Sequence, residues 1–216
     1  DDPSRTWFAV TEGALVGGRF PRIDLMNLRS LDVVVADASD DSAYVRRTLN
    51  VSRQDDVADT LDRSVELADD RALVFQHEVS ETADGRDWAL ELEHVTDPDR
   101  DAILTDVRFL ARDGHSYDVY VVVDTAVSNS GQTDQAAVVE QGGGNGNGNG
   151  GPPGHGGSVL TAVDGGSNDD AAVIRDPDGE PYNVALAATA RRGFDWTSVD
   201  VVGGDSLSPL VTEGDD

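Results

Sequence analysis

The chain contains no cysteine and no lysine. The absence of cysteine excludes disulfides, a thiolate nucleophile and cysteine-ligated zinc. No apolar run approaches the roughly 20 residues that a membrane-spanning helix needs. The sixteen basic residues form no stripe that could follow a phosphate backbone. We therefore expect neither a membrane nor nucleic acid as a partner.

What the chain has in excess is negative charge. It carries 42 acidic residues in 216, for a formal net charge of −26. Such a charge repels itself in dilute buffer, and this repulsion disappears at molar salt, where the Debye length is about 3 Å. The acids alternate with Val, Ile and Leu instead of forming a tail. We expect a soluble protein of a high-salt, halophilic environment, and the sequence leaves open whether it is cytoplasmic or secreted.

Apolar residues recur mostly at every second position, which is typical of half-buried strands. In Trp88–Val95 the residues Trp88, Leu90 and Leu92 share one face, and acidic residues occupy the other. A similar strand is predicted over Ala72–Val79, and Asp84-Gly85 between the two is a strong hairpin signal.

The remaining strand candidates are short and separated by turn residues. They are Trp7–Val10, Leu31–Val35, Tyr44–Leu49, Ala102–Leu110, Tyr117–Val123, Val159–Val163, Ala171–Ile174 and Asn183–Ala188. Tyr117–Val123 is apolar on both faces, which favours a central strand. Val57–Leu67 fits either a short helix or a loop followed by a strand. This spacing predicts an all-β protein, an antiparallel β-sandwich.

We expect one sandwich domain over residues 1–216, with a flexible Gly/Asn-rich loop over 142–157. The 59 residues after this loop hold too few large apolar groups for a core of their own. The loop is therefore interpreted as an insertion and not as a domain boundary.

Several short segments occur in an order that is known from one family. They are Trp7-Phe8, Glu12-Gly13, Phe20-Pro21-Arg22-Ile23-Asp24, Arg29–Val33, Ala72–Val79, Asp84-Gly85, Trp88–Val95, Thr96-Asp97-Pro98, Tyr117–Asp124 with Asn129 and Gly131, Gly193-Phe194 and Val202–Asp205. In these segments the chain resembles the N-terminal, non-catalytic domain of glucodextranase and of prokaryotic glucoamylases in glycoside hydrolase family fifteen. The chain departs from the family at Thr125, where proline is usual, and at Gly204-Asp205, where Ser-Asp is usual.

The resemblance implies a β-supersandwich like that of galactose mutarotase. In the family this domain precedes an (α/α)₆ barrel, which holds the two catalytic glutamates. The resemblance therefore implies a barrel partner in the same or a neighbouring chain and a role in α-glucan breakdown. It implies no catalytic residue and no cofactor in this chain. The family's domain continues for several strands beyond the point reached at Asp216, so either the chain is trimmed or its closing strands are missing.

Three tryptophans are the candidates for an aromatic platform against sugar or against a partner domain. Trp88 follows the predicted buried face, so we interpret it as a core residue. Trp196 and Trp7 are retained as the candidate carbohydrate or domain contacts.

The other candidate sites have simpler structural interpretations. Glu91 and Glu93 share a strand face that is typical of solvated acids. The acidic segments Asp97–Asp101 and Asp176–Glu180 lack the ligand spacing of a calcium loop and are interpreted as turns. His77 and His94 lie on apolar faces, where hydrogen-bonded core-edge histidines are expected and not metal ligands. No metal site is predicted.

Two hypotheses remain open. The first is an accessory domain of a glucoamylase-like hydrolase, which packs on the catalytic barrel and stabilises it. The second is a free-standing carbohydrate-binding or surface-interaction module. A complete enzyme is the weakest alternative, since no catalytic constellation rises above the acidic background.

Overall fold

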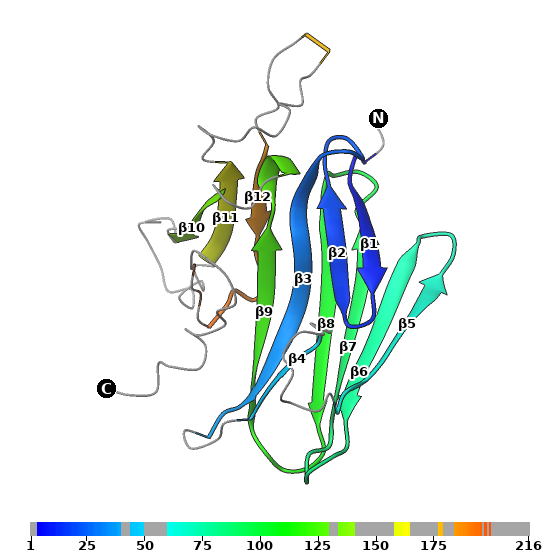
Figure 1. Cartoon of the computed structure of the whole chain (residues 1–216), viewed down its shortest axis with the longest axis vertical. Helices are drawn as coiled ribbons and strands as arrows, with labels where there is room; N and C mark the ends of the chain where they lie inside the picture. Colours follow the sequence, from blue (N-terminus) through cyan, green and yellow to red (C-terminus); the bar gives the residue numbers. More distant parts are fainter. Residues whose placement is uncertain are drawn as a thin grey trace, which may run out of the picture.

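The computed structural model describes residues 4–39, 44–49, 60–129, 134–140, 158–164, 177–178, 184–195, 197 and 199. Across these ranges the chain forms antiparallel strands and one short 3₁₀ turn, so the predicted all-β class is confirmed. Two large sheets lie one over the other, and a smaller third sheet lies beside them (Figure 1). A search of the described residues finds no helix that could cross a membrane.

The first sheet is organised around its longest strand, β3 (Met26–Asp37). The N-terminal half of β3 pairs with β2 (Ala14–Arg19), which in turn pairs with β1 (Trp7–Thr11). Its C-terminal half pairs along the same edge with β4 (Val45–Arg47). The opposite edge pairs along most of its length with β9 (Tyr117–Thr125).

The second sheet is a simple meander. Its order is β5 (Asp62–Asp69), β6 (Val74–Glu81), β7 (Trp88–Thr96) and β8 (Ile103–Ala111). The predicted Asp84-Gly85 hairpin joins β6 to β7, and both residues have a positive φ, 53° and 80°. Two central residues of positive φ define the tight hairpin turn that Asp-Gly favours. The Arg86 N–H closes the turn by donating to the Ala83 carbonyl at 2.9 Å.

The third sheet consists of β10 (Asp134–Glu140), β11 (Ser158–Asp164) and β12 (Ala185–Ala188). The turn η1 (Val127–Asn129) leads from β9 toward it. A small core joins this sheet to the loop before β3, and it contains Leu25, Val127, Ala162 and Val184. The sequence pattern predicts β11 and β12, whereas it predicts neither β10 nor, in the first sheet, β2.

The main core lies between the two large sheets. The predicted inner face of β7 is confirmed, since Trp88, Leu90 and Leu92 are at most 1% exposed. They pack with Val33, Val35, Leu61 and Val79, and Phe109, Tyr117 and Val121 border the cluster. Burying one such side chain contributes about 2 kcal/mol. The alternation of β7 therefore fixes which face of the second sheet turns inward.

Two predictions are settled by the strand pairings. Residues 62–69 form a strand, so the loop-plus-strand alternative is right for this part of Val57–Leu67, and residues 57–59 lie outside the described ranges. The prediction that Tyr117–Val123 is a central strand is wrong for the described sheets, where β9 pairs with β3 alone. Its second face, with Tyr120 and Val122, is only half buried. A strand can thus be apolar on both faces although only one of its edges pairs in the described sheets.

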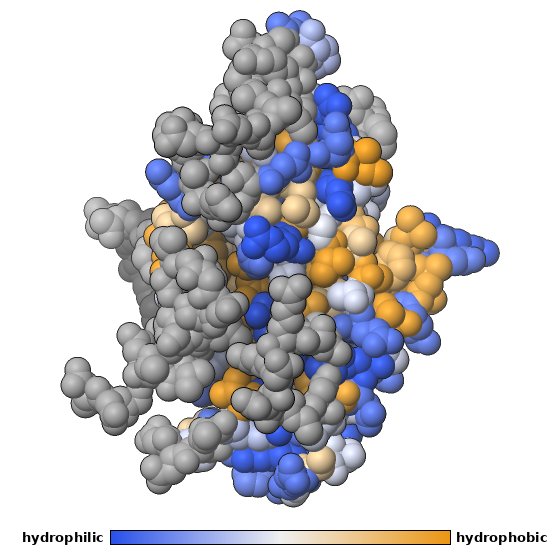
Figure 2. All heavy atoms as spheres, in the orientation of Figure 1, coloured by the Kyte–Doolittle hydropathy of each residue, from blue (hydrophilic) through white to orange (hydrophobic). Residues whose placement is uncertain are grey.

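The second sheet is wider than the first on one side. In Figure 1, β5 extends past β1, the last described strand of the first sheet. Figure 2 shows apolar residues on the surface in this region, next to a hydrophilic tip. The predicted loop over 142–157 and the predicted strand Ala171–Ile174 both lie outside the described residues.

Candidate functional site

Two of the three tryptophans lie in the described residues, and they differ in burial. Trp7 begins β1 and is 38% exposed, so it remains available as a contact residue. Trp88 is fully buried, which confirms its interpretation as a core residue, and its indole N–H donates to the Tyr44 hydroxyl at 2.6 Å. Trp196 lies outside the described residues.

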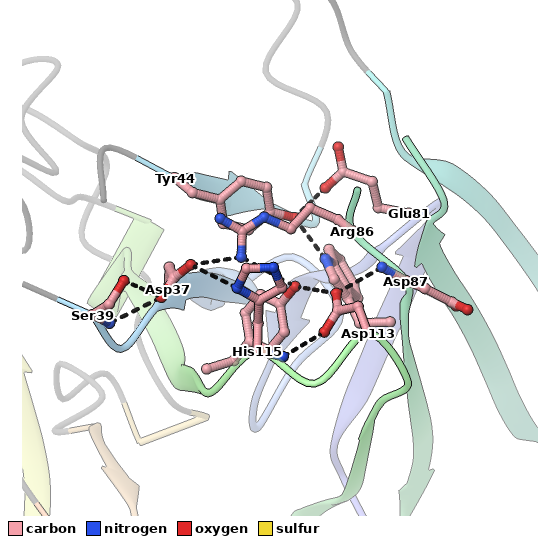
Figure 3. A network of polar contacts seen from close by, with 10 residues as sticks. Asp37, Ser39, Tyr44, Glu81, Arg86, Asp87, Asp113 and His115 are labelled. Carbon is pink, nitrogen blue, oxygen red and sulfur yellow. Dashed lines mark hydrogen bonds and ion pairs between the residues drawn. The ribbon is translucent and has the colours of Figure 1, made fainter. Parts of the chain in front are cut away.

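A polar network of side chains closes one end of the sandwich (Figure 3). We call it the end cluster, and it consists of Asp37, Tyr44, Glu81, Arg86, Asp113, His115 and Tyr117. These residues come from the ends of β3 and β6, the position just before β4, the hairpin turn, the loop between β8 and β9 and the first residue of β9. Antiparallel strands bring such distant segments to the same end of a sandwich.

Glu81 is the buried carboxylate of the end cluster. It is 0% exposed and accepts hydrogen bonds from the hydroxyls of Tyr44 and Thr60 and from the Arg46 Nε–H at 3.1 Å. Burial alone would raise its pKa, but the donated hydrogen bonds and the Arg46 charge lower it on balance. Glu81 is therefore an ionised, fully paired group and has no proton to donate to a substrate.

Arg86 holds the other half of the end cluster together. Its guanidinium lies 4.2 Å from the ring centre of Tyr44 and 5.6 Å from that of Tyr117. It also forms an ion pair with Asp37 at 2.6 Å. Hydrogen bonds from Ser39 and from Arg86 lower the pKa of Asp37. Stacking and ion pairing together fix Arg86 between the two sheets.

Asp113 completes the end cluster in the same way. Its carboxylate accepts hydrogen bonds from the Tyr117 hydroxyl at 2.6 Å and from the backbone N–H groups of Asp87 and His115 at 2.7 and 2.9 Å. Burial would raise its pKa, but these bonds lower it to about 2. The acids of the end cluster are thus charged, and their oxygens already accept hydrogen bonds from neighbouring residues.

The outer face of the second sheet carries the acids that the sequence placed there. Arg108 on β8 binds Glu91 at 2.9 Å and Glu93 at 3.7 Å, and also Asp106 at 3.0 Å. The Arg108 side chain is 57% exposed. Such a solvated pairing contributes little free energy. Its geometry agrees with the interpretation of Glu91 and Glu93 as surface acids.

The acidic turn after β7 is held by hydrogen bonds to Asp97 from within the turn. The Asp97 carboxylate accepts from the backbone N–H of Asp99 at 2.9 Å and from Arg100 at 2.8 Å. Pro177 and Asp178 also lie in a turn. Among the residues that the structure describes, no group of three or more potential ligands could hold a metal ion.

The buried histidines depart from expectation. His77 and His94 are 0% exposed, and their rings meet edge to face with centres 5.0 Å apart. His94 Nδ1 lies 3.0 Å from the Thr105 hydroxyl. Both ring nitrogens of His77 lack a hydrogen-bond partner, so the prediction of a hydrogen-bonded histidine is wrong there. Burial lowers both pKa values to about 4, with His77 adding to the effect on His94.

The shifted carboxyls among the described residues all have pKa values below their usual range. Glycoside hydrolysis by two carboxylates needs one acid that is protonated near neutral pH. Every described carboxyl with a displaced pKa is displaced downward, and these are Asp37, Asp69, Glu81, Asp97 and Asp113.

Comparison with known proteins gives the fold its context. A family model described as glucodextranase, domain N, matches residues 1–215. The chain belongs to this family. This domain N chain is 25% identical over 139 residues to a glucoamylase of Clostridium sp. (strain G0005), which covers 63% of the chain and 18% of the relative.

The fold of domain N recurs in a solved structure. The chain resembles a bacterial glucoamylase crystallised with acarbose, with a TM-score of 0.54 and 18% identity over 74% of the chain. The match covers 21% of the glucoamylase chain. Domain N thus spans about a fifth of the length of the glucoamylases that it matches.

Proposed function

We propose that the chain is an accessory, non-catalytic domain of a glucoamylase- or glucodextranase-like hydrolase acting on α-glucans. It would pack on and stabilise a catalytic (α/α)₆ barrel in the same or a neighbouring chain. One observation carries the proposal: the chain matches domain N over residues 1–215, yet spans only about a fifth of the glucoamylases it resembles. The downward-shifted carboxyls of the end cluster support the non-catalytic role.

The test uses the 216-residue chain in molar KCl. We expect no release of glucose from maltooligosaccharides or starch. We also expect the chain to raise the melting temperature of the glucoamylase-type catalytic domain from the same organism when the two are mixed. Hydrolysis by the chain alone would contradict the non-catalytic role. A catalytic domain that neither binds nor responds to the chain would contradict the accessory role.

A second candidate is a carbohydrate-binding or surface-interaction module. The exposed Trp7 ring favours it, since sugars stack on exposed aromatic faces. Calorimetric titration with maltooligosaccharides should then give a binding isotherm that Trp7→Ala or Trp196→Ala abolishes. Binding that survives both substitutions would remove the two tryptophans as the site.

We further propose that the chain is one salt-adapted domain over residues 1–216. The net charge of −26 supports this, because carboxylates at such density need counterions to stay close together. The chain should melt in a single transition, at a higher temperature in molar KCl than in dilute buffer. Equal melting temperatures in the two solvents would contradict the salt adaptation, and two transitions would contradict the single domain.

A further inference from the structure

His77 on β6 is a buried polar side chain without a hydrogen-bond partner. It is 0% exposed, and both of its ring nitrogens lack a partner. Its ring meets that of His94 edge to face, with centres 5.0 Å apart. Buried polar groups in folded proteins are almost always hydrogen-bonded, so this exception calls for an explanation. A neutral imidazole is tolerated at such a site, whereas a charged one would need an acceptor.

Among the described residues, the charged groups on the inner faces around His77 include no free anion. On β5, Arg63 is itself a cation and donates to backbone carbonyls. On β6, Glu81 lies about 13 Å farther along the strand and already accepts three hydrogen bonds. Asp37 at the end of β3 is paired with a cation, the inner residues of β1 and β8 are uncharged, and β7 presents His94. A protonated His77 would therefore stay unpaired in the closed sandwich.

The strand β5 separates His77 from solvent at the edge of the second sheet (Figure 1). Val65, which pairs with His77, is 36% exposed, and Leu67 is 45% exposed. Along β5 every residue except Arg63 is exposed. The turn to β6 also holds Leu73 at a φ of 52°, which is a strained conformation for leucine. A strand with so little buried apolar surface is among the first parts of a sandwich to open.

Opening of β5 and protonation of His77 favour one another. Once β5 has separated, β6 is the edge strand, and water reaches the His77 ring from the open side of the sheet. Burial lowers the pKa of His77 from 6.5 to about 4, so the open form takes up a proton before the closed form does. Opening is therefore favoured as the pH falls below about 6.5, and the closed form is fully favoured above it.

We propose that β5 is an acid-released strand, which separates from β6 when His77 takes up one proton from solvent. Arg63 keeps the start of β5 attached, because it donates to backbone carbonyls outside the strand. Residues 64–69 move away, and the rest of the two large sheets stays paired. At neutral pH the proton leaves and β5 pairs again. The domain thus presents the inner side of β6, with Phe75 and His77, only in acid.

The test is hydrogen exchange of the 216-residue chain in molar KCl at pH 7 and pH 5, expressed as protection factors. We expect the protection of β5 amides to fall about twentyfold at pH 5, and that of β7, β8 and β9 amides to stay within about threefold. His77→Leu should remove the fall in β5. The control is His115→Leu, which removes a histidine whose side chain is 47% exposed and should keep the response of the unmodified chain.

A second readout uses the unmodified chain, so it does not depend on how a variant folds. The ring resonances of His77 should titrate over the same pH range in which β5 loses protection. A ring that becomes protonated while β5 stays protected would overturn the proposal. So would an equal loss of protection in β7, β8 and β9, a fall in β5 that persists in His77→Leu, or β5 amides that are already unprotected at pH 7.

Discussion

Two buried polar side chains of the sandwich, Glu81 and His77, differ in charge state. At the end of the sandwich, Glu81 is charged and surrounded by donors from Tyr44, Thr60 and Arg46. In the interior, the His77 ring nitrogens have no hydrogen-bond partner, its ring contacts that of His94, and it stays neutral. The comparison teaches that burial alone does not decide the charge state. Donors at the strand ends stabilise the Glu81 anion, whereas His77 has no acceptor that would stabilise its cation.

The largest expected effect on the free energy of unfolding comes from removing the charged group, Glu81. Glu81→Ala leaves Arg46 with a half-buried guanidinium and two hydroxyls without their acceptor. Removing one partner from a buried ion pair costs about 3–5 kcal/mol. Urea unfolding in molar KCl should show this loss in the free energy of unfolding. Glu81→Gln keeps an acceptor and should lose clearly less; an equal loss in both variants would show that the charge is not what matters.

The contribution of His77 to stability should be lost at mildly acidic pH. Because burial lowers the pKa of His77 from 6.5 to about 4, the unfolded chain takes up protons before the folded chain does. Stability from His77 is complete above about pH 6.5 and is lost as the pH falls toward 4. This loss amounts to roughly 3 kcal/mol if His77 acts alone. His77→Leu should flatten the stability profile between pH 6.5 and 4, and a profile as steep as that of the unmodified chain would contradict the assignment.

The acids of the end cluster should make stability depend on pH below the range in which His77 acts. Their pKa values are lowered in the folded chain, so their contribution is present above the pKa of the unfolded carboxyls and is lost as the pH falls through the folded values. Asp113→Asn should therefore reduce the slope of stability against pH only below about pH 4. At neutral pH we expect a smaller loss of stability than in Glu81→Ala, because the hydrogen bonds of Asp113 are weakened and not removed. A change of slope near pH 6 would assign the effect to another group.

The smallest effect is expected on the outer face. Arg108 binds three acids, but its side chain is 57% exposed. Exposed pairs contribute about 0–1 kcal/mol, and salt screens them. Arg108→Ala should change the free energy of unfolding by less than about 0.5 kcal/mol in molar KCl. A loss comparable to that of Glu81→Ala would mean that surface and interior pairing are not distinct in this chain.

Much of the fold could be predicted because its signals are local. The alternation of Trp88, Leu90 and Leu92 and the Asp84-Gly85 turn each lie within one strand or one hairpin. β2 escaped prediction because its sequence, ALVGGR, breaks the alternation with two glycines. At Gly18 a side chain would collide with Leu28 on β3, with a β-carbon only 2.9 Å from that of Leu28. The packing that explains Gly18 is thus non-local.

The end cluster could not be predicted for a related reason. Arg86 joins Asp37 across 49 positions, and Tyr44 joins Glu81 across 37. Each residue alone resembles an ordinary turn or strand end. Only the topology, which folds β3, β6 and β9 to a common end, brings them into contact. Val65 and Leu67 on β5 show the opposite: their alternation predicts an inward, buried face. The sequence does not show that the described part of the first sheet ends before it covers them.

The central position of β3 has a consequence for the order of folding. The meander β5–β8 forms from neighbours in sequence, whereas Val33 of β3 must find Val121 of β9. Closing a long loop costs entropy before its contacts are made, so distant pairings form late. The whole meander can therefore assemble before β9 reaches β3. The first sheet then closes over an existing meander, and the contacts of the Arg86 guanidinium with Tyr44 and Tyr117 can form only once the two sheets meet.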